Sequence, residues 1–239
     1  MALTPSSDLL AATWIASSAQ SWQHLVGFGP SGFGAYARLR FLPDPVYEGQ
    51  SESDNDIADD APSETAQLRA ALEVLAGHTR TPKDCYFCLW DGWGWTVGGG
   101  DGAWALSLQQ AGATGSEPML TSAPPPGAVP ALRDRSNDPP SAPLAPKVAI
   151  PNRAYFLFRG SVSDLGDWGA PQQGPGDSAI GMPDPAFIWP ADHAWCVADD
   201  VDPHWAGIGA STAAIDQLLA DPRLDVVRAD PTEDQPNYW

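Results

Sequence analysis

Two pairs of potential metal ligands stand out in the chain, Cys85-x-x-Cys88 and His193-x-x-Cys196. The first has the spacing used by zinc sites and thioredoxin-like redox motifs, and the second could complete a Cys3His zinc site. Both uses require the sulfur atoms to converge. Residues 85–90 are apolar throughout and predict a buried strand, on which positions three apart point to opposite faces. We therefore favour buried structural cysteines and predict no cofactor, with structural zinc as the alternative.

Asp192-His193 is the best candidate for a catalytic acid–base pair. Neighbouring residues in an extended chain point apart, however, so the pair does not have the arrangement of a catalytic triad. The chain also lacks a Gly-x-Ser-x-Gly motif, a His-Glu-x-x-His motif and a kinase signature. A hydrolase is therefore an alternative to a non-enzymatic role, and the further groups available to it are Asp91, Arg159 (as an anion holder), Cys196 and His204.

The segment after the central strand is rich in tryptophan, with Trp90, Trp93, Trp95 and Trp104 close in sequence. Aromatic faces stack on sugars and organic cations, and Asp91 could add a polar contact. A small-ligand or glycan binder is therefore a second alternative. Core packing is the favoured use of Trp90 and Trp95.

Composition limits the partners that the protein can have. The chain has 239 residues with 12 Lys and Arg against 30 Asp and Glu, a net charge of −18. This balance argues against nucleic acid and anionic membranes, and it permits attraction to a basic protein. No apolar run approaches the ~20 residues of a membrane span, and no signal peptide is recognised. Three cysteines offer no disulfide framework, so we expect a cytoplasmic protein.

The hydrophobic pattern predicts an α+β fold, a mainly antiparallel sheet flanked by a few helices, with long Pro/Gly-rich and acidic loops. A short helix is expected within 8–26, although Trp14-Ile15 and 22–26 are alternative strands. Strands and further helices are indicated by alternating or continuous apolar runs and by Ser caps. The expected strands are 33–41, 85–90, 104–108, 153–160, 187–190, 194–198, 205–208 and 224–227, and the helices are 64–76 and 212–220.

Long segments of biased composition separate these elements. Residues 48–63 form an acidic loop and residues 110–147 a Pro/Ala-rich loop, both expected to be flexible. We predict a single domain, 1–239, and the alternative is two lobes, 1–110 and 147–239, tethered by the second loop. Arg38 and Arg40 are expected on a solvated strand face, paired with acidic neighbours. The polar, Pro-broken tail after residue 229 is expected to be frayed, with Tyr238-Trp239 as the one candidate for an ordered end.

An ordered set of motifs resembles a family of uncharacterised proteins of high-GC actinobacteria. The motifs are Phe33-x-Ala-Tyr-Ala-Arg38, His78-Thr-x-Thr-Pro82, Cys85-x-Phe-x-x-Trp-Asp-Gly92, Arg153-x-Tyr-x-Leu-Phe-Arg-Gly160, Trp189-Pro-Ala-Asp-x-Ala-Trp-Cys-Val-Ala198 and Leu218-Leu-x-Asp-Pro-x-Leu224. They span most of the chain outside the two loops. The resemblance implies a soluble bacterial protein and no particular chemistry. That family has Arg at the position of His193, which weakens both the zinc and the catalytic hypotheses for this residue.

The leading functional hypothesis is a non-enzymatic acidic module that binds a basic protein, in the manner of bacterial immunity proteins. It is a functional analogy drawn from charge and from aromatic residues that can anchor an interface. The predicted binding surface joins two turns, provided that the fold brings them together, and small ligands are not excluded. Its candidate residues are Asp91, Trp93, Trp95, Arg159, Asp192 and His193.

Overall fold

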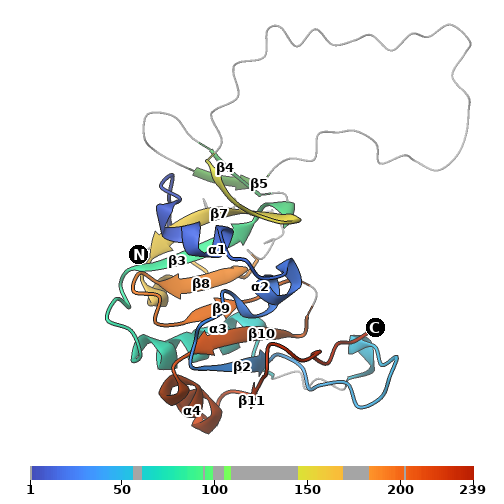
Figure 1. Ribbon diagram of the computed structural model, residues 1–239. Coiled ribbons are helices and arrows are strands. Elements are labelled where there is room, and N and C mark those ends of the chain that lie inside the picture. The colour runs from blue at the N-terminus through green and yellow to red at the C-terminus, as the bar shows by residue number, and fades with distance from the viewer. Residues whose placement is uncertain are drawn as a thin grey trace, which may run out of the picture.

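The computed structural model describes residues 2–55, 61–93, 95–98, 105–108, 145–168, 183–201 and 203–239. Within these ranges, nine strands form one antiparallel sheet and four α-helices accompany it (Figure 1). The predicted α+β class with a mainly antiparallel sheet is confirmed. No helix in the described ranges is both long enough and apolar enough to cross a membrane.

The sheet has the strand order β1-β7-β3-β8-β9-β10-β2-β11, and β6 also pairs with β7. The bounds are β1 Thr4–Pro5, β2 Ala35–Arg40, β3 Cys85–Trp90, β6 Lys147–Ile150, β7 Arg153–Gly160, β8 Phe187–Pro190, β9 Cys196–Ala198, β10 Trp205–Ala210 and β11 Val226–Arg228. A separate antiparallel pair consists of β4 (Trp95–Gly98) and β5 (Ala105–Leu108). This pair corresponds to the predicted returning strand at 104–108.

The central strand β3 pairs on both sides with strands from the later part of the chain. It pairs with β7 on one side, where Phe87 lies opposite Phe158, and with β8 on the other, where Phe87 lies opposite Ile188. At the far side of the sheet, β2 lies between β10 and β11. One sheet therefore contains strands from both segments, the part of the chain before residue 110 and the part from residue 147 onward.

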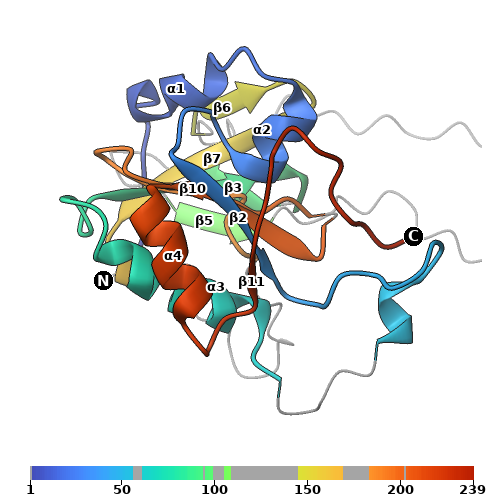
Figure 2. The same cartoon turned by 60° about the horizontal axis from the view of Figure 1, so that its bottom comes forward.

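Helices cover both faces of this sheet (Figure 2). α3 (Glu64–Ala76) and α4 (Thr212–Ala220) pack on one face, and their apolar side chains share a core with Phe87, Phe158 and Ile208. The other face carries α1 (Thr13–Ala16) and α2 (Trp22–Phe28), which share a second core with alternate residues of the same strands. Because side chains alternate along a strand, one central sheet supplies both cores. Short 3-10 turns complete the fold: η1 Leu10–Ala12, η2 Glu52–Asp54, η3 Asp91–Trp93 and η5 Val162–Asp164.

The helices begin at serine caps that the sequence contains. Ser63 accepts a hydrogen bond from the Ala66 N–H at the start of α3, and Ser211 does the same for Ala214 in α4. Both helices match their predicted ranges, 64–76 and 212–220. Ser21 caps α2 in the same way through the N–H of His24. The alternative strands at Trp14-Ile15 and 22–26 are wrong, because these residues lie in α1 and α2.

Glycine in β10 sets how closely α2 approaches the sheet. A Cβ atom on Gly207 would lie 1.9 Å from the carbonyl oxygen of Gly27 in α2, a distance that no packing allows. A Cβ atom on Gly209 would lie 2.4 Å from the ring of Phe33. Glycine inside a strand commonly marks such a close backbone approach. Because Gly207 has no side chain, α2 can lie directly against β10.

The two predicted loops are described only in part. Of the acidic loop 48–63, residues 56–60 lie outside the described ranges, and residues 52–54 form η2. A capping box between Ser51 and Asp54 stabilises that turn. Of the Pro/Ala-rich loop 110–147, only the last three residues are described, and Lys147 begins β6.

Candidate functional site

The two cysteines of the Cys-x-x-Cys motif lie on opposite faces of β3. Cys85 belongs to the core under α3 and α4, whereas Cys88 belongs to the core under α1 and α2 together with Cys196. All three are free thiols, and burial raises the pKa of each, that of Cys85 to about 12. Across the described ranges, no three His, Cys, Asp or Glu side chains are grouped to hold a metal ion. Cys85 and Cys88 therefore cannot ligate one ion or form a redox pair without unfolding the strand.

His193 occupies an exposed position in the turn between β8 and β9. Its backbone adopts a left-handed conformation with φ of 53°, which His tolerates better than most residues. Its ring stacks on Trp14 with centroids 4.2 Å apart and an interplanar angle of 12°. Partial burial of the imidazole ring lowers the pKa of His193, and the negative charge of Asp192 opposes this effect. A neutral imidazole stacked on Trp14 is a packing contact that holds α1 to the turn.

The Asp192 side chain connects the β8–β9 turn to the 79–81 segment through hydrogen bonds. Its carboxylate accepts hydrogen bonds from the Thr79 hydroxyl at 2.6 Å, the Arg80 N–H at 2.8 Å and the Ala194 N–H at 3.3 Å. Burial works to raise the pKa of Asp192, but these hydrogen bonds outweigh it and the pKa is lowered. A carboxylate that is held ionised by three donors is a poor general base. Asp192 thus binds the 79–81 segment to the β8–β9 turn.

Replacing Asp192 with Ala should lower the free energy of unfolding by ~2–3 kcal/mol, because three donors lose a charged acceptor. The lowered pKa means that this contribution is complete above the ordinary Asp pKa and declines as the pH falls through the folded-state value. Urea denaturation of wild type and variant at neutral and acidic pH measures both effects. Asp216→Ala, which removes an exposed carboxylate paired with Arg228, is the control. A neutral result at Asp192 would contradict the structural role.

Arg159 and Asp91 are both engaged in ion pairs. Arg159 forms a bidentate pair with Asp84 at 2.6 and 2.9 Å and is 56% exposed, so it faces solvent rather than an enclosed anion site. Asp91 accepts a hydrogen bond from the Lys147 ammonium at 2.9 Å. The side chains of Trp93 and Trp95, and all of Trp104, lie outside the described structure, so the stacking prediction for them stays a prediction.

The two turns of the predicted binding surface do not meet. Asp91 follows the last residue of β3, whereas Pro190, which precedes the Asp192 turn, lies opposite Cys85 at the first residue of β3. The N–H of Ala191 accordingly bonds to the Asp84 carbonyl oxygen at 2.9 Å. Six strand residues separate the two ends by roughly 17–20 Å. The antiparallel register therefore overturns the joint surface of Asp91 and Asp192 with His193.

A group of carboxylates lies near the start of α3. Burial and mutual repulsion raise the pKa of Glu64 and Asp199, and burial raises that of Asp184, which accepts a hydrogen bond from the Thr65 hydroxyl at 2.8 Å. Burial is the main cause of the raised pKa of Asp199, and repulsion from Asp184, Glu64 and Asp200 adds to it. Protonation relieves this repulsion, so these groups favour the folded state more at low pH than at neutral pH.

The C-terminal tail, 230–239, is fixed along one side of the molecule. The Trp205 Nε1–H donates to the Pro236 carbonyl oxygen at 3.3 Å, and the Trp239 N–H donates to that of Gln50 at 3.0 Å. The Tyr238 hydroxyl donates to the Pro43 carbonyl oxygen at 2.5 Å. The candidate ordered end at Tyr238-Trp239 is confirmed, whereas the fraying expected for the rest of the tail is wrong at Pro236. Tail and loop 43–55 together form what we call the tail–loop surface.

A buried charge network lies beneath this surface. Arg38, 5% exposed, forms a bidentate pair with Asp44 at 2.6 and 3.0 Å, and Arg40 bonds to the same carboxylate at 3.1 Å. The His204 Nε2 lies 3.2 Å from Asp44, and Tyr238 packs edge-on against the imidazole. The predicted pairing of Arg38 and Arg40 with acidic residues is correct, but Arg38 is buried rather than solvated.

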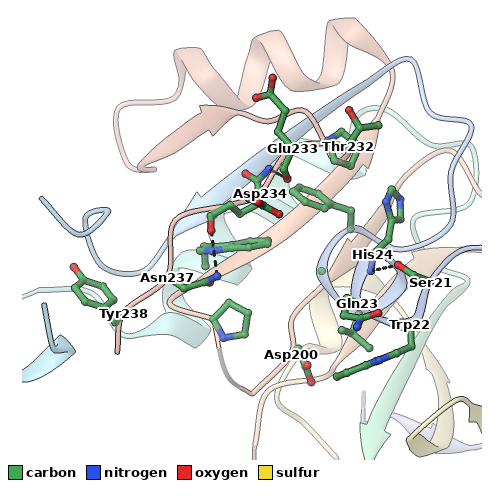
Figure 3. A pocket seen from close by; sticks show the side chains of 17 residues that line it. Ser21, Trp22, Gln23, His24, Asp200, Thr232, Glu233, Asp234, Asn237 and Tyr238 are labelled. Carbon is green, nitrogen blue, oxygen red and sulfur yellow. Dashed lines mark hydrogen bonds between the residues drawn. The ribbon is translucent and has the colours of Figure 1, made fainter. Parts of the chain in front are cut away.

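A cavity of about 540 Å³ lies between α2 and the tail (Figure 3). Trp22, Gln23 and His24 line it from α2, and tail residues including Glu233 and Asp234 line it from the other side. Val26, Phe28 and Trp205 are almost fully buried and form an apolar floor. The volume falls in the usual range of ligand pockets, ~300–1,000 Å³. The sequence offered no signal for it, because its walls come from opposite ends of the chain.

Comparison of the chain with protein-family models, curated proteins and solved structures finds no match. The resemblance to an actinobacterial family therefore stays a prediction.

Proposed function

We propose that the protein is a non-enzymatic binding module for a basic protein and that the tail–loop surface is its contact surface. The observation that carries the proposal is the composition of this surface. Besides Asp44, whose carboxylate is paired with Arg38 and Arg40, residues 43–55 and 230–239 contain six acidic residues and no Lys or Arg: Glu48, Glu52, Asp54, Asp230, Glu233 and Asp234. Contacts at Gln50, Pro43 and Trp205 hold the two segments in place.

Exposed apolar side chains lie among these carboxylates. Val46, Tyr47 and Trp239 are 85%, 57% and 84% exposed, and they are three of the six large apolar side chains that are exposed in the described ranges. Tyr and Trp are the residues most often responsible for affinity at protein interfaces, and complementary charge guides the partners together. The surface thus combines aromatic anchors with an acidic surround, which suits a partner that carries Lys and Arg.

The contacts of the catalytic candidates support binding over hydrolysis. Asp192 serves three donors as a structural acceptor, and His193 is stacked on Trp14. Cys196 is buried, and burial raises the pKa of its thiol, so it lacks the thiolate that nucleophilic catalysis requires. None of these groups faces another in the arrangement of an acid–base pair.

The proposal is tested by purifying the N-terminally tagged protein from a lysate of its native host at about 50 mM and about 500 mM salt. We expect a basic protein to be retained at low salt and lost at high salt. Binding of that purified protein should then weaken about 5–10-fold in the variant Glu48→Gln/Glu52→Gln, because both carboxylates are exposed and have no ion-pair partner among the described residues. Trp239→Ala should weaken it at least about 10-fold.

The matched control is Glu73→Gln/Asp216→Asn, which removes the same charge from α3 and α4, away from the tail–loop surface. It should change the affinity less than about twofold. A complex that resists high salt, or that is equally sensitive to both double variants, would refute the tail–loop surface as the contact surface.

A further inference from the structure

The cavity between α2 and the tail has an uneven distribution of charge. At one end, Asp200 is paired with Arg153 at 3.4 Å, and this guanidinium also lies 5.6 Å from the centroid of Trp22. The charges of Asp200 and Arg153 therefore compensate each other at that end of the cavity. At the tail wall, the carboxylates of Glu233 and Asp234 are exposed and make no hydrogen bond or ion pair with any described residue. The described lining includes no Lys or Arg, so the tail wall is negative.

The rest of the described lining contains no Asp, Glu, Lys or Arg and is partly apolar. Val26, Phe28 and Trp205 form the apolar floor, and the α2 wall adds the uncharged groups of Ser21 and Gln23. Apolar side chains of this kind pack well against the methylene groups of a long side chain. The floor therefore suits an aliphatic stem, and the charged end of that stem is drawn to the tail wall.

We propose that this cavity receives one lysine or arginine side chain of the basic partner, an inference that rests on the proposed function. The methylene stem lies over Val26, Phe28 and Trp205, and the cationic head group bonds to Glu233 or Asp234. Long basic side chains bury their stems along apolar surface in this way while the head stays at the water boundary. The cavity continues into the tail–loop surface at Tyr238, so one partner can occupy both.

The probe for this site is Nα-acetyl-arginine methylamide, and its neutral counterpart is the citrulline compound of nearly the same shape. Each is titrated at pH 7 and constant low salt into ¹⁵N-labelled full-length protein, and backbone amide shifts are followed. We expect saturable shifts confined to residues 21–28 and 231–238. The affinity of the citrulline compound should be at least about fivefold weaker, because it lacks the charge.

The variant Glu233→Gln/Asp234→Asn should bring the affinity for the arginine compound down to that for the citrulline compound. Glu73→Gln, which removes an exposed carboxylate from α3, should leave it unchanged. The spectrum of each variant also reports whether it is folded. Equal binding of both compounds, shifts spread over acidic residues such as Glu73, or insensitivity to the double variant would each overturn the proposal.

The outcome separates this inference from the proposed function, because no partner protein is present in the titration. A salt-sensitive complex that depends on Glu48, Glu52 and Trp239, together with no arginine binding in the cavity, would leave the proposed function standing and remove the cavity from it. Arginine binding without any basic partner would identify a cation site and refute the protein-binding role.

Discussion

Gly207→Ala is expected to destabilise the protein by more than ~3 kcal/mol and to leave little folded protein at 37 °C. The added methyl group would lie 1.9 Å from the Gly27 carbonyl oxygen and 2.9 Å from the ring of Phe28, and the nearer atom is backbone that cannot rotate away. Relief requires that α2 move off the sheet. That movement would open the second core, to which Leu25 and Cys196 belong.

The matched control is the reciprocal substitution, Gly27→Ala. A Cβ atom there meets only the Trp205 ring, at 3.5 Å, an ordinary van der Waals distance. Alanine also favours a helix over glycine by up to ~1 kcal/mol, so this variant should be as stable as wild type or slightly more stable. Thermal and urea unfolding measure both. If Gly207→Ala were as stable as Gly27→Ala, the close approach of α2 and β10 would be disproved.

Asp44→Asn is expected to lower the free energy of unfolding by ~2.5–4 kcal/mol, which is the second of the two largest expected effects. Burial works to raise the pKa of Asp44, but Arg38, His204 and Arg40 outweigh it and lower the pKa to about 2. The shift from the ordinary value corresponds to ~2.5 kcal/mol. Loss of the carboxylate also leaves Arg38 buried with its main partner neutral, which is costly.

The pH dependence of this effect has a definite sign. A carboxylate whose folded pKa is depressed stabilises the protein fully above its unfolded pKa, and the contribution is lost as the pH falls toward about 2. Wild type should therefore lose stability between about pH 4 and pH 2 more steeply than Asp44→Asn. Asp216→Asn, at an exposed pair, should differ from wild type by less than ~0.5 kcal/mol. Parallel acid-unfolding curves for wild type and Asp44→Asn would contradict the network.

The strands and helices that the sequence predicted best are those with strong local signals. The run 153–160 is an apolar, mainly aromatic stretch between two arginines, and β7 has these bounds. α3 and α4 match because a serine cap precedes each helix, and Gly77 or Asp221-Pro222 follows it. Cys85 and Cys88 lie on opposite faces because strand periodicity leaves no other choice.

The first helices were harder to predict. Residues 22–26 are a short mixed run that suits a strand as well as a helix, and the Ser21 cap is supplemented by the close contact of α2 with Gly207 in β10. That contact joins residues far apart in the sequence, so local propensity carries no information about it. The same limitation hid the burial of Arg38, which depends on Asp44, His204 and the tail.

The candidate site could not be predicted from sequence for a related reason. The tail has the composition of a frayed end, yet carbonyl oxygens of Pro236 and Pro43 accept hydrogen bonds from Trp205 and Tyr238. Charge and aromatic content led to the hypothesis of an acidic binding protein, which stays a prediction. The turns first assigned to that role lie at opposite ends of β3, because the register of β8 was not known.

The position of β2 has a consequence for biosynthesis. Ala37 pairs with Ile208 in β10 and with Arg228 in β11, so β2 is synthesised well before the strands that it pairs with. Contacts between distant parts of a chain slow folding and leave apolar strands exposed in the meantime. β2 therefore remains without these sheet partners until β10 and β11 have been synthesised, and we expect chaperones to protect it during that interval.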